Sequence, residues 1–173
     1  HVGERALSHA IARHRGIDPD APTSRRLFAH NEQSARIVEL LERDGGGLNL
    51  TREVVDGIRS HTGSLRASTL EGRAVALADR IAYVCHDIDD AERAGLLAEK
   101  DLPSGPRSTL GASSSERIET MVRDVVTSSA RTGDVEMSPI VREAMLEMRS
   151  FLFRNLYSHG DAKWEEPKAY AML

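Results

Sequence analysis

The segment 69–95 constrains the fold of this chain more than any other part of the sequence. Its apolar residues recur at alternating spacings of four and three, the period of one face of an α-helix: Leu70, Ala74, Leu77, Ile81, Val84 and Ile88. A second set, of polar residues, falls on the opposite side of the same helix: Asp79, Tyr83, His86 and Asp90, with Asp87 at its flank. Such side chains bind metals or form directional hydrogen bonds, whereas an ordinary solvated face carries mostly Lys and Glu. The segment therefore predicts a long amphipathic helix with a chemically capable polar face.

The composition is typical of a helical protein without a membrane span. The 173 residues are 40% hydrophobic but only 4% aromatic, so aliphatic side chains and Met must fill the core of one domain or a large piece of one. No apolar run is long enough to cross a bilayer, and the net charge of −4 argues against bulk affinity for nucleic acid. A single cysteine, Cys85, excludes an internal disulfide and favours a cytoplasmic location. Because the first residue is His1 and not Met, we expect the natural N-terminus to lie upstream.

Helical patterns occupy most of the remaining sequence. Thr51 and the Ser138-Pro139 pair are helix-start signals. Helices are predicted over residues 4–15, 25–43, 52–61, 116–130 and 139–157. Residues 101–116 are rich in Pro, Gly and Ser and are predicted to form a loop. The expected architecture is an all-α helical bundle in which residues 1–100 form the core and residues 117–173 form a C-terminal helical part packed on the same domain.

Histidines and carboxylates carry whatever chemistry the chain has, because the sequence contains no phosphate-binding glycine loop, no nucleophile elbow and no paired-cysteine zinc motif. His1 and Glu4 lie three residues apart and would share a helical face, either as an acid–base pair or as an ordinary surface pair. Taken alone, His30 and His61 fit capping or surface positions near helix ends.

Asp79 is the strongest candidate on the polar face of the 69–95 helix. Small neighbours would let another helix approach it closely: Ala76, Ala78 and Ala82. A carboxylate at such a contact must be paired or bind a metal, because burying an unpaired charge is costly. Arg80 could neutralise an anion. Acidic residues late in a helix are disfavoured by its macrodipole, so their presence here indicates that they have a purpose other than helix formation. Periodicity alone leaves open whether the face is functional or structural.

Several segments, taken together, resemble one family almost from end to end. They are HVGERAL at 1–7, FAHNEQSARIVELLE at 28–42, GLNLTREVVDGI at 47–58, TLEGRAVALADRIAYVCHDIDDAERAG at 69–95, RIETMVRDVV at 117–126 and MSPIVREAMLEMRSFLFRNLY at 137–157. The chain resembles the bacterial deoxyguanosine triphosphate triphosphohydrolases and their relatives in the HD phosphohydrolase superfamily. The resemblance implies the all-α HD-type bundle, shortened here at its N-terminus.

The resemblance also implies roles for particular residues. His1 and Glu4 match a catalytic His–Glu pair, and His30 matches a histidine that faces the substrate phosphates. Asp79 matches the last ligand of a single divalent metal such as Mg²⁺ or Mn²⁺. The other ligands, a histidine and a consecutive His-Asp pair, would lie upstream, so we expect this chain alone not to retain the ion. Arg80 matches a residue near the phosphates, while Tyr83 and Asp87 match residues that hold the deoxyribose.

The implied activity is metal-dependent hydrolysis of a deoxynucleoside triphosphate to the deoxynucleoside and inorganic triphosphate, with the chain as given inactive by itself. Two alternatives stay open: an HD phosphohydrolase of another nucleotide, and a non-catalytic helical module for oligomerisation or nucleotide sensing. The resemblance further implies a homo-oligomer without a membrane partner, in which nucleic acid acts only as an effector.

Overall fold

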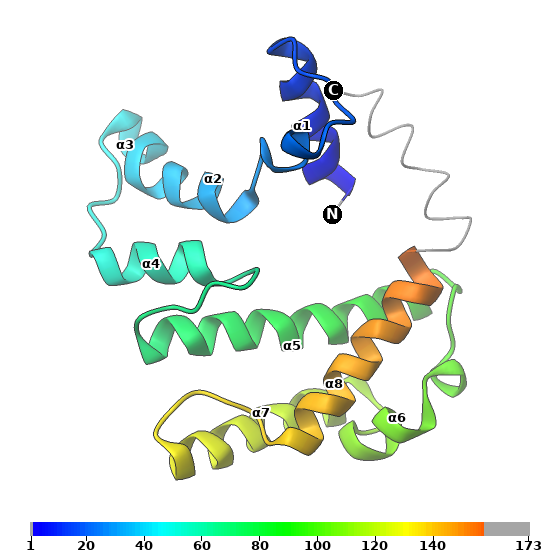
Figure 1. The fold of residues 1–173 in the computed structure, drawn as a ribbon. Coiled ribbons are helices and arrows are strands. Elements are labelled where there is room, and N and C mark those ends of the chain that lie inside the picture. The colour runs from blue at the N-terminus through cyan, green and yellow to red at the C-terminus, as the bar shows by residue number, and fades with distance from the viewer. Residues whose placement is uncertain (1, 158–173) are drawn as a thin grey trace. The chain divides into compact units, whose positions relative to one another are not determined.

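The computed structural model describes residues 2–157, and within that range every regular element is a helix (Figure 1). The predicted all-α class is therefore confirmed. The described residues form two compact units, 2–68 and 69–157, so that the helix of segment 69–95 is grouped with the C-terminal helices. None of the helices in residues 2–157 combines the length and the apolar composition that a membrane span requires.

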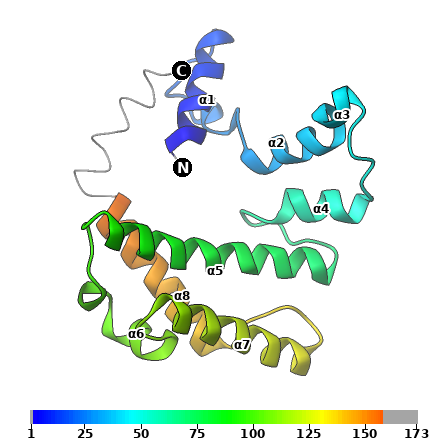
Figure 2. The same ribbon diagram turned by 180° about the vertical axis from the view of Figure 1, so that it is seen from behind.

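The first unit consists of short helices joined by tight turns. Its elements are α1 (Val2–His14), the 3₁₀ turn η1 (Pro22–Arg26), α2 (His30–Arg36), the π-helical turn η2 (Ile37–Leu41), α3 (Glu42–Gly45) and α4 (Arg52–Ser60). In both views α2 and α4 lie side by side (Figures 1 and 2). The predicted cap of α4 is confirmed, because the Thr51 hydroxyl accepts a hydrogen bond from the Val54 N–H.

The continuous helix predicted over residues 25–43 is wrong. Ala29 is extended, with φ −134° and ψ 120°, so α2 begins only at His30. The C-terminal end of the predicted helix forms a turn in which Arg43 and Asp44 adopt left-handed conformations. Leu48 then donates its N–H to the Val38 carbonyl at 2.7 Å. This close return requires glycine at Gly47, where a Cβ would lie 2.1 Å from a carbonyl oxygen.

The second unit packs around the C-terminal half of its longest helix. Its elements are α5 (Leu70–Arg93), the 3₁₀ turn η3 (Glu99–Asp101), α6 (Ser104–Leu110), α7 (Ser114–Thr132), α8 (Pro139–Leu152) and the π-helical turn η4 (Phe153–Tyr157). The helix predicted from segment 69–95 is confirmed as α5, with the Thr69 hydroxyl accepting the Gly72 N–H at 3.1 Å. The Ser138 cap of α8 is also confirmed.

The apolar stripe of α5 is buried along only part of its length. Ile81, Val84 and Ile88 are buried in one cluster with residues of α6, α7 and α8. Leu70, at the start of the helix, is 46% exposed. The core of this unit therefore covers the C-terminal half of α5 and leaves its first turns open.

The loop predicted over residues 101–116 contains helix α6, so that prediction is wrong for its central part. Its Ser, Gly and Pro residues are weak helix formers, yet Pro106 and Leu110 are buried against the neighbouring helices. Pro106 sits in the first turn, where its missing N–H leaves no bond unmade. Tertiary burial thus outweighs the local composition.

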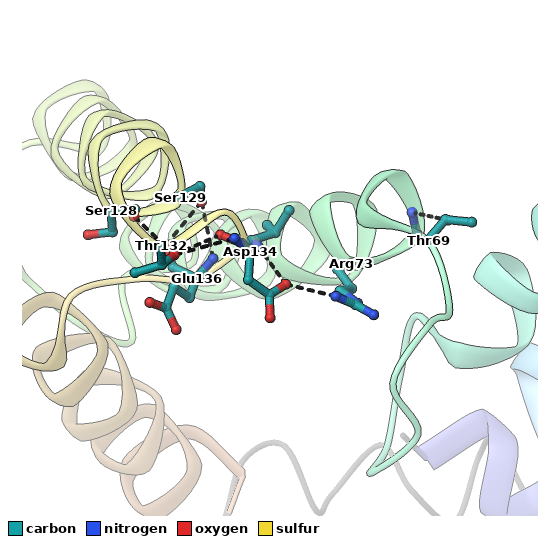
Figure 3. A network of polar contacts seen from close by, with 9 residues as sticks. Thr69, Arg73, Ser128, Ser129, Thr132, Asp134 and Glu136 are labelled. Atoms are coloured by element: carbon teal, nitrogen blue, oxygen red, sulfur yellow. Dashed lines mark hydrogen bonds and ion pairs between the residues drawn. The ribbon is translucent and has the colours of Figure 1, made fainter.

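A polar network fixes the connection between α7 and α8 (Figure 3). Arg73 of α5 donates from Nη1 to Oδ1 of Asp134 at 2.9 Å, and the same oxygen accepts the Val135 N–H at 2.8 Å. Ser129 Oγ accepts the Glu136 N–H at 3.1 Å. The ion pair joins the first half of α5 to this connection.

Candidate active site

Glu4 and His30, which the sequence singles out separately, lie in direct contact in the first unit. Glu4 Oε1 accepts the backbone N–H of His30 at 2.9 Å and lies 3.2 Å from His30 Nδ1. An ionised carboxylate only accepts hydrogen bonds, so the contact places the ring proton on Nδ1. The two side chains are 26% and 38% exposed for Glu4 and His30, respectively, which leaves the imidazole accessible to a ligand. The arrangement is that of a carboxylate-oriented acid–base histidine.

Local structure explains why His30 is held so firmly. It is the first residue of α2, and the N–H groups of a first helical turn have no partner within the helix. Ala29 provides no side-chain cap, and Glu4 of α1 supplies the missing acceptor. One carboxylate therefore both caps α2 and orients the imidazole of its first residue.

A second imidazole lies beside the first. The rings of His30 and His61 have centroids 5.2 Å apart and meet edge-on, at 66°. His61 Nδ1 lies 2.6 Å from the carbonyl oxygen of Ile58, so this nitrogen carries a proton as well. The sequence had favoured a purely structural role for His61 at the end of a helix.

Asn31 holds the two helices that carry these histidines. Its amide Nδ2 donates to the carbonyl oxygen of Arg59 at 2.7 Å, which ties the start of α2 to the end of α4. The Arg59 guanidinium also contacts α2 and η2, at 3.4 Å from Glu32 and 2.9 Å from Glu39. No local sequence pattern marks Asn31, because its partner is a backbone atom 28 residues along the chain.

The remaining predicted residues lie on α5 in the second unit. Asp79 and Arg80 are exposed, while Tyr83 and Asp87 are half-buried. Asp79 and Arg80 form no hydrogen bond or ion pair within the described part of the chain. Among residues 2–157 no group of three or more His, Cys, Asp or Glu side chains is gathered in a way that could hold a metal ion. His1 lies outside the described residues.

Two of the late acids of α5 have structural partners. Asp89 Oδ2 accepts the hydroxyl of Ser114 at 2.9 Å, and Asp90 pairs with Arg93 at 3.2 Å. These contacts explain why Asp89 and Asp90 occur late in α5, where the helix macrodipole disfavours acidic residues.

Comparison with known proteins identifies relatives over almost the whole chain. It is 45% identical over 163 residues, 94% of its length, to a protein of Caldanaerobacter subterraneus subsp. tengcongensis. It is 44% identical to a protein of Clostridium perfringens in an alignment of 176 positions that covers 96% of the chain. It is 43% identical to one of Clostridium tetani in an alignment of 157 positions that covers 84% of the chain. All three are named "deoxyguanosinetriphosphate triphosphohydrolase-like protein". The chain is a relative of these triphosphohydrolase-like proteins.

This finding confirms the resemblance that the sequence segments indicated. The chain spans about half the length of these triphosphohydrolase-like relatives: 48%, 52% and 45%, respectively. No protein-family model matches it. The roles of individual residues remain predictions, supported here by the contact between Glu4 and His30.

Proposed function

We propose that this chain forms part of a hydrolase that converts a deoxynucleoside triphosphate, such as dGTP, to the deoxynucleoside and inorganic triphosphate. The observation that carries the proposal is the Glu4–His30 contact, at 2.9 Å and 3.2 Å, in a relative of triphosphohydrolase-like proteins. It supplies an oriented imidazole, which such a reaction needs for proton transfer.

The products define which bond must break. Release of all three phosphates together requires cleavage between the α-phosphorus and the 5′ oxygen of the deoxyribose. A water oxygen bonds to phosphorus and loses its protons, and the 5′ oxygen gains one to leave as a hydroxyl. The imidazole of His30 carries a proton in one of these transfers, and the Glu4 carboxylate stabilises the positive ring that forms.

The proposal also keeps the substrate-binding roles that the resemblance implies for residues on the polar face of α5. Arg80 neutralises phosphate charge, and Tyr83 and Asp87 hold the sugar through its 3′-hydroxyl. A carboxylate such as Asp87 accepts a hydrogen bond from a hydroxyl but would repel a phosphate, so its place is at the sugar.

The implied divalent metal does not fit the described residues alone. Asp79 is exposed, and it belongs to no group of three or more His, Cys, Asp or Glu side chains in residues 2–157 that could hold a metal ion. We propose that Asp79 is one ligand of a site completed by residues upstream of this chain, and that the 173-residue chain by itself neither retains the ion nor turns over substrate.

A product assay tests the proposal and separates it from its rivals. The protein extended with its in-frame upstream coding sequence is incubated with dGTP and Mg²⁺ or Mn²⁺, and the phosphates are separated by ion chromatography. Inorganic triphosphate is the expected product. Pyrophosphate or orthophosphate alone would instead indicate an HD phosphohydrolase of different specificity, and no product with retained oligomerisation would favour a non-catalytic module.

A further inference from the structure

We propose that His61 is a second phosphate-facing residue, and that His30 and His61 together form a subsite for the triphosphate chain of the substrate. This His30–His61 pair lies wholly in the first unit, with ring centroids 5.2 Å apart. The inference rests on the proposed function for the identity of its ligand. It assigns a role to His61 that neither the sequence pattern nor the named relatives provide.

Both imidazole rings are held through their Nδ1 atoms. His30 is held through Nδ1 by Glu4 at 3.2 Å, and His61 is held through Nδ1 by the Ile58 carbonyl at 2.6 Å. An imidazole oriented through Nδ1 offers its Nε2 edge to a ligand, which is the arrangement of many functional histidines. The Nε2 atom of His61 makes no hydrogen bond or ion pair within residues 2–157.

A hydrogen bond between α2 and the end of α4 positions His61 beside His30. Asn31, the residue after His30, donates to the Arg59 carbonyl at 2.7 Å. The anchored carbonyl is only two residues from His61, so the Asn31 amide sets the register between the two imidazoles. This hydrogen bond joins the start of α2 to the last turn of α4, next to its C-cap residue His61.

Charge favours an anionic ligand at this pair. Glu4 is already engaged with His30, and no carboxylate pairs with His61 in the described residues. A protonated imidazole carries a positive charge and donates hydrogen bonds from both ring nitrogens. Charge-assisted hydrogen bonds to phosphate oxygens are stronger than neutral ones. A triphosphate chain is long enough to contact both rings at once.

Two isosteric variants separate binding from folding. Asparagine places its amide near the position of Nδ1, so His61→Asn retains a donor for the Ile58 carbonyl but lacks the Nε2 edge. Glutamine places its amide near Nε2, so His61→Gln retains a donor toward the anion. His14→Asn is the matched control, because His14 is an exposed histidine at the end of α1 in the same unit.

The experiment titrates the 173-residue chain with inorganic tripolyphosphate at about pH 6.5, near the imidazole pKa, and follows the Cε1–H resonances of each histidine by NMR. We expect the His30 and His61 resonances to shift with one dissociation constant while that of His14 stays fixed. His61→Asn should weaken binding about tenfold, as expected for loss of a hydrogen bond to a charged group. His61→Gln should weaken it less, and His14→Asn should leave it unchanged.

A His61 resonance that stays fixed, or equal affinity of His61→Asn and His14→Asn, would overturn the inference. The proposed function fails independently, through absence of triphosphate release from dGTP by the upstream-extended protein. If that protein is active and His61→Asn is as active as His14→Asn, only the subsite is wrong.

Discussion

Replacing Glu99 by alanine should destabilise the second unit strongly, because it leaves a buried guanidinium without its counter-ion. Arg117 of α7 is 1% exposed, and its Nη1 donates to Glu99 Oε2 at 2.9 Å. Its Nε is buried without a hydrogen-bond partner in the described part of the chain, so the Glu99 contact matters all the more. Arg107 lies 3.4 Å from the other carboxylate oxygen and adds a longer ion pair.

The magnitude follows from this burial. Removing one partner of a buried ion pair costs about 3–5 kcal/mol. Glu99 is 29% exposed and Arg107 is 40% exposed, so water partly screens the site. We therefore expect the lower end for Glu99→Ala, about 3 kcal/mol. Arg117→Met removes the buried charge together with the need for a partner and should cost no more than about 1 kcal/mol.

Amide hydrogen exchange of buried residues in α5 and α7 reports the free energy of opening of this unit directly. The matched control is Glu119→Ala, which breaks an ion pair with Arg123 on the same helix whose side chains are 66% and 77% exposed. That control should cost about 0.5 kcal/mol or less. If Glu99→Ala costs no more than Glu119→Ala, the reasoning about the buried pair is wrong.

Three further predictions address pH, thiol reactivity and backbone conformation. Hydrogen bonds from the backbone N–H and hydroxyl of Ser68 hold the pKa of Asp56 below its ordinary value. The wild type should therefore be more stable than Asp56→Asn in neutral solution and should lose this advantage as the pH falls below about 4. Urea unfolding at several pH values would measure the difference. Burial raises the pKa of the Cys85 thiol to about 11, so a disulfide reagent at neutral pH should label it only after unfolding, and rapid labelling of the native chain would contradict this. Gly47→Ala should destabilise the first unit by about 2 kcal/mol or more, and by more than Gly63→Ala. Both glycines have a positive φ, but only at Gly47 would a Cβ lie 2.1 Å from a backbone carbonyl oxygen. Equal melting temperatures of the two variants would refute this prediction.

The sequence predicts those elements whose signals are local. Thr69 and the four-three apolar repeat define α5, and Ser138-Pro139 defines the start of α8, because caps and periodicity depend on residues within a few turns. The short helix α6 escapes prediction because its Gly, Pro and Ser residues favour a loop, and only burial of Leu110 by distant helices stabilises it. The break at Ala29 has no local signal either.

The candidate site follows the same division. Resemblance to a family singled out Glu4 and His30 individually, yet their contact joins residues 26 apart in sequence and is visible only in the folded unit. His61 contacts the ring of His30 on α2, and Asn31 donates to the backbone carbonyl of Arg59 on α4. No sequence pattern predicts contacts of this kind. Sequence periodicity located Asp79 on an exposed face, but no local pattern shows which side chains could join it at a metal.

The role of the Glu4–His30 contact is tested by comparing triphosphate release by Glu4→Gln and Glu32→Gln in the upstream-extended protein. Glu4 contacts His30, whereas Glu32, in the same unit, is 59% exposed and forms an ion pair with Arg59 at 3.4 Å. A glutamine at position 4 can still accept the His30 N–H, but it cannot stabilise the positive imidazole. We predict a fall in kcat of about a hundredfold or more for Glu4→Gln, with Glu32→Gln close to wild type. Equal rates of inorganic triphosphate release from the two variants would show that Glu4 has no catalytic role through His30.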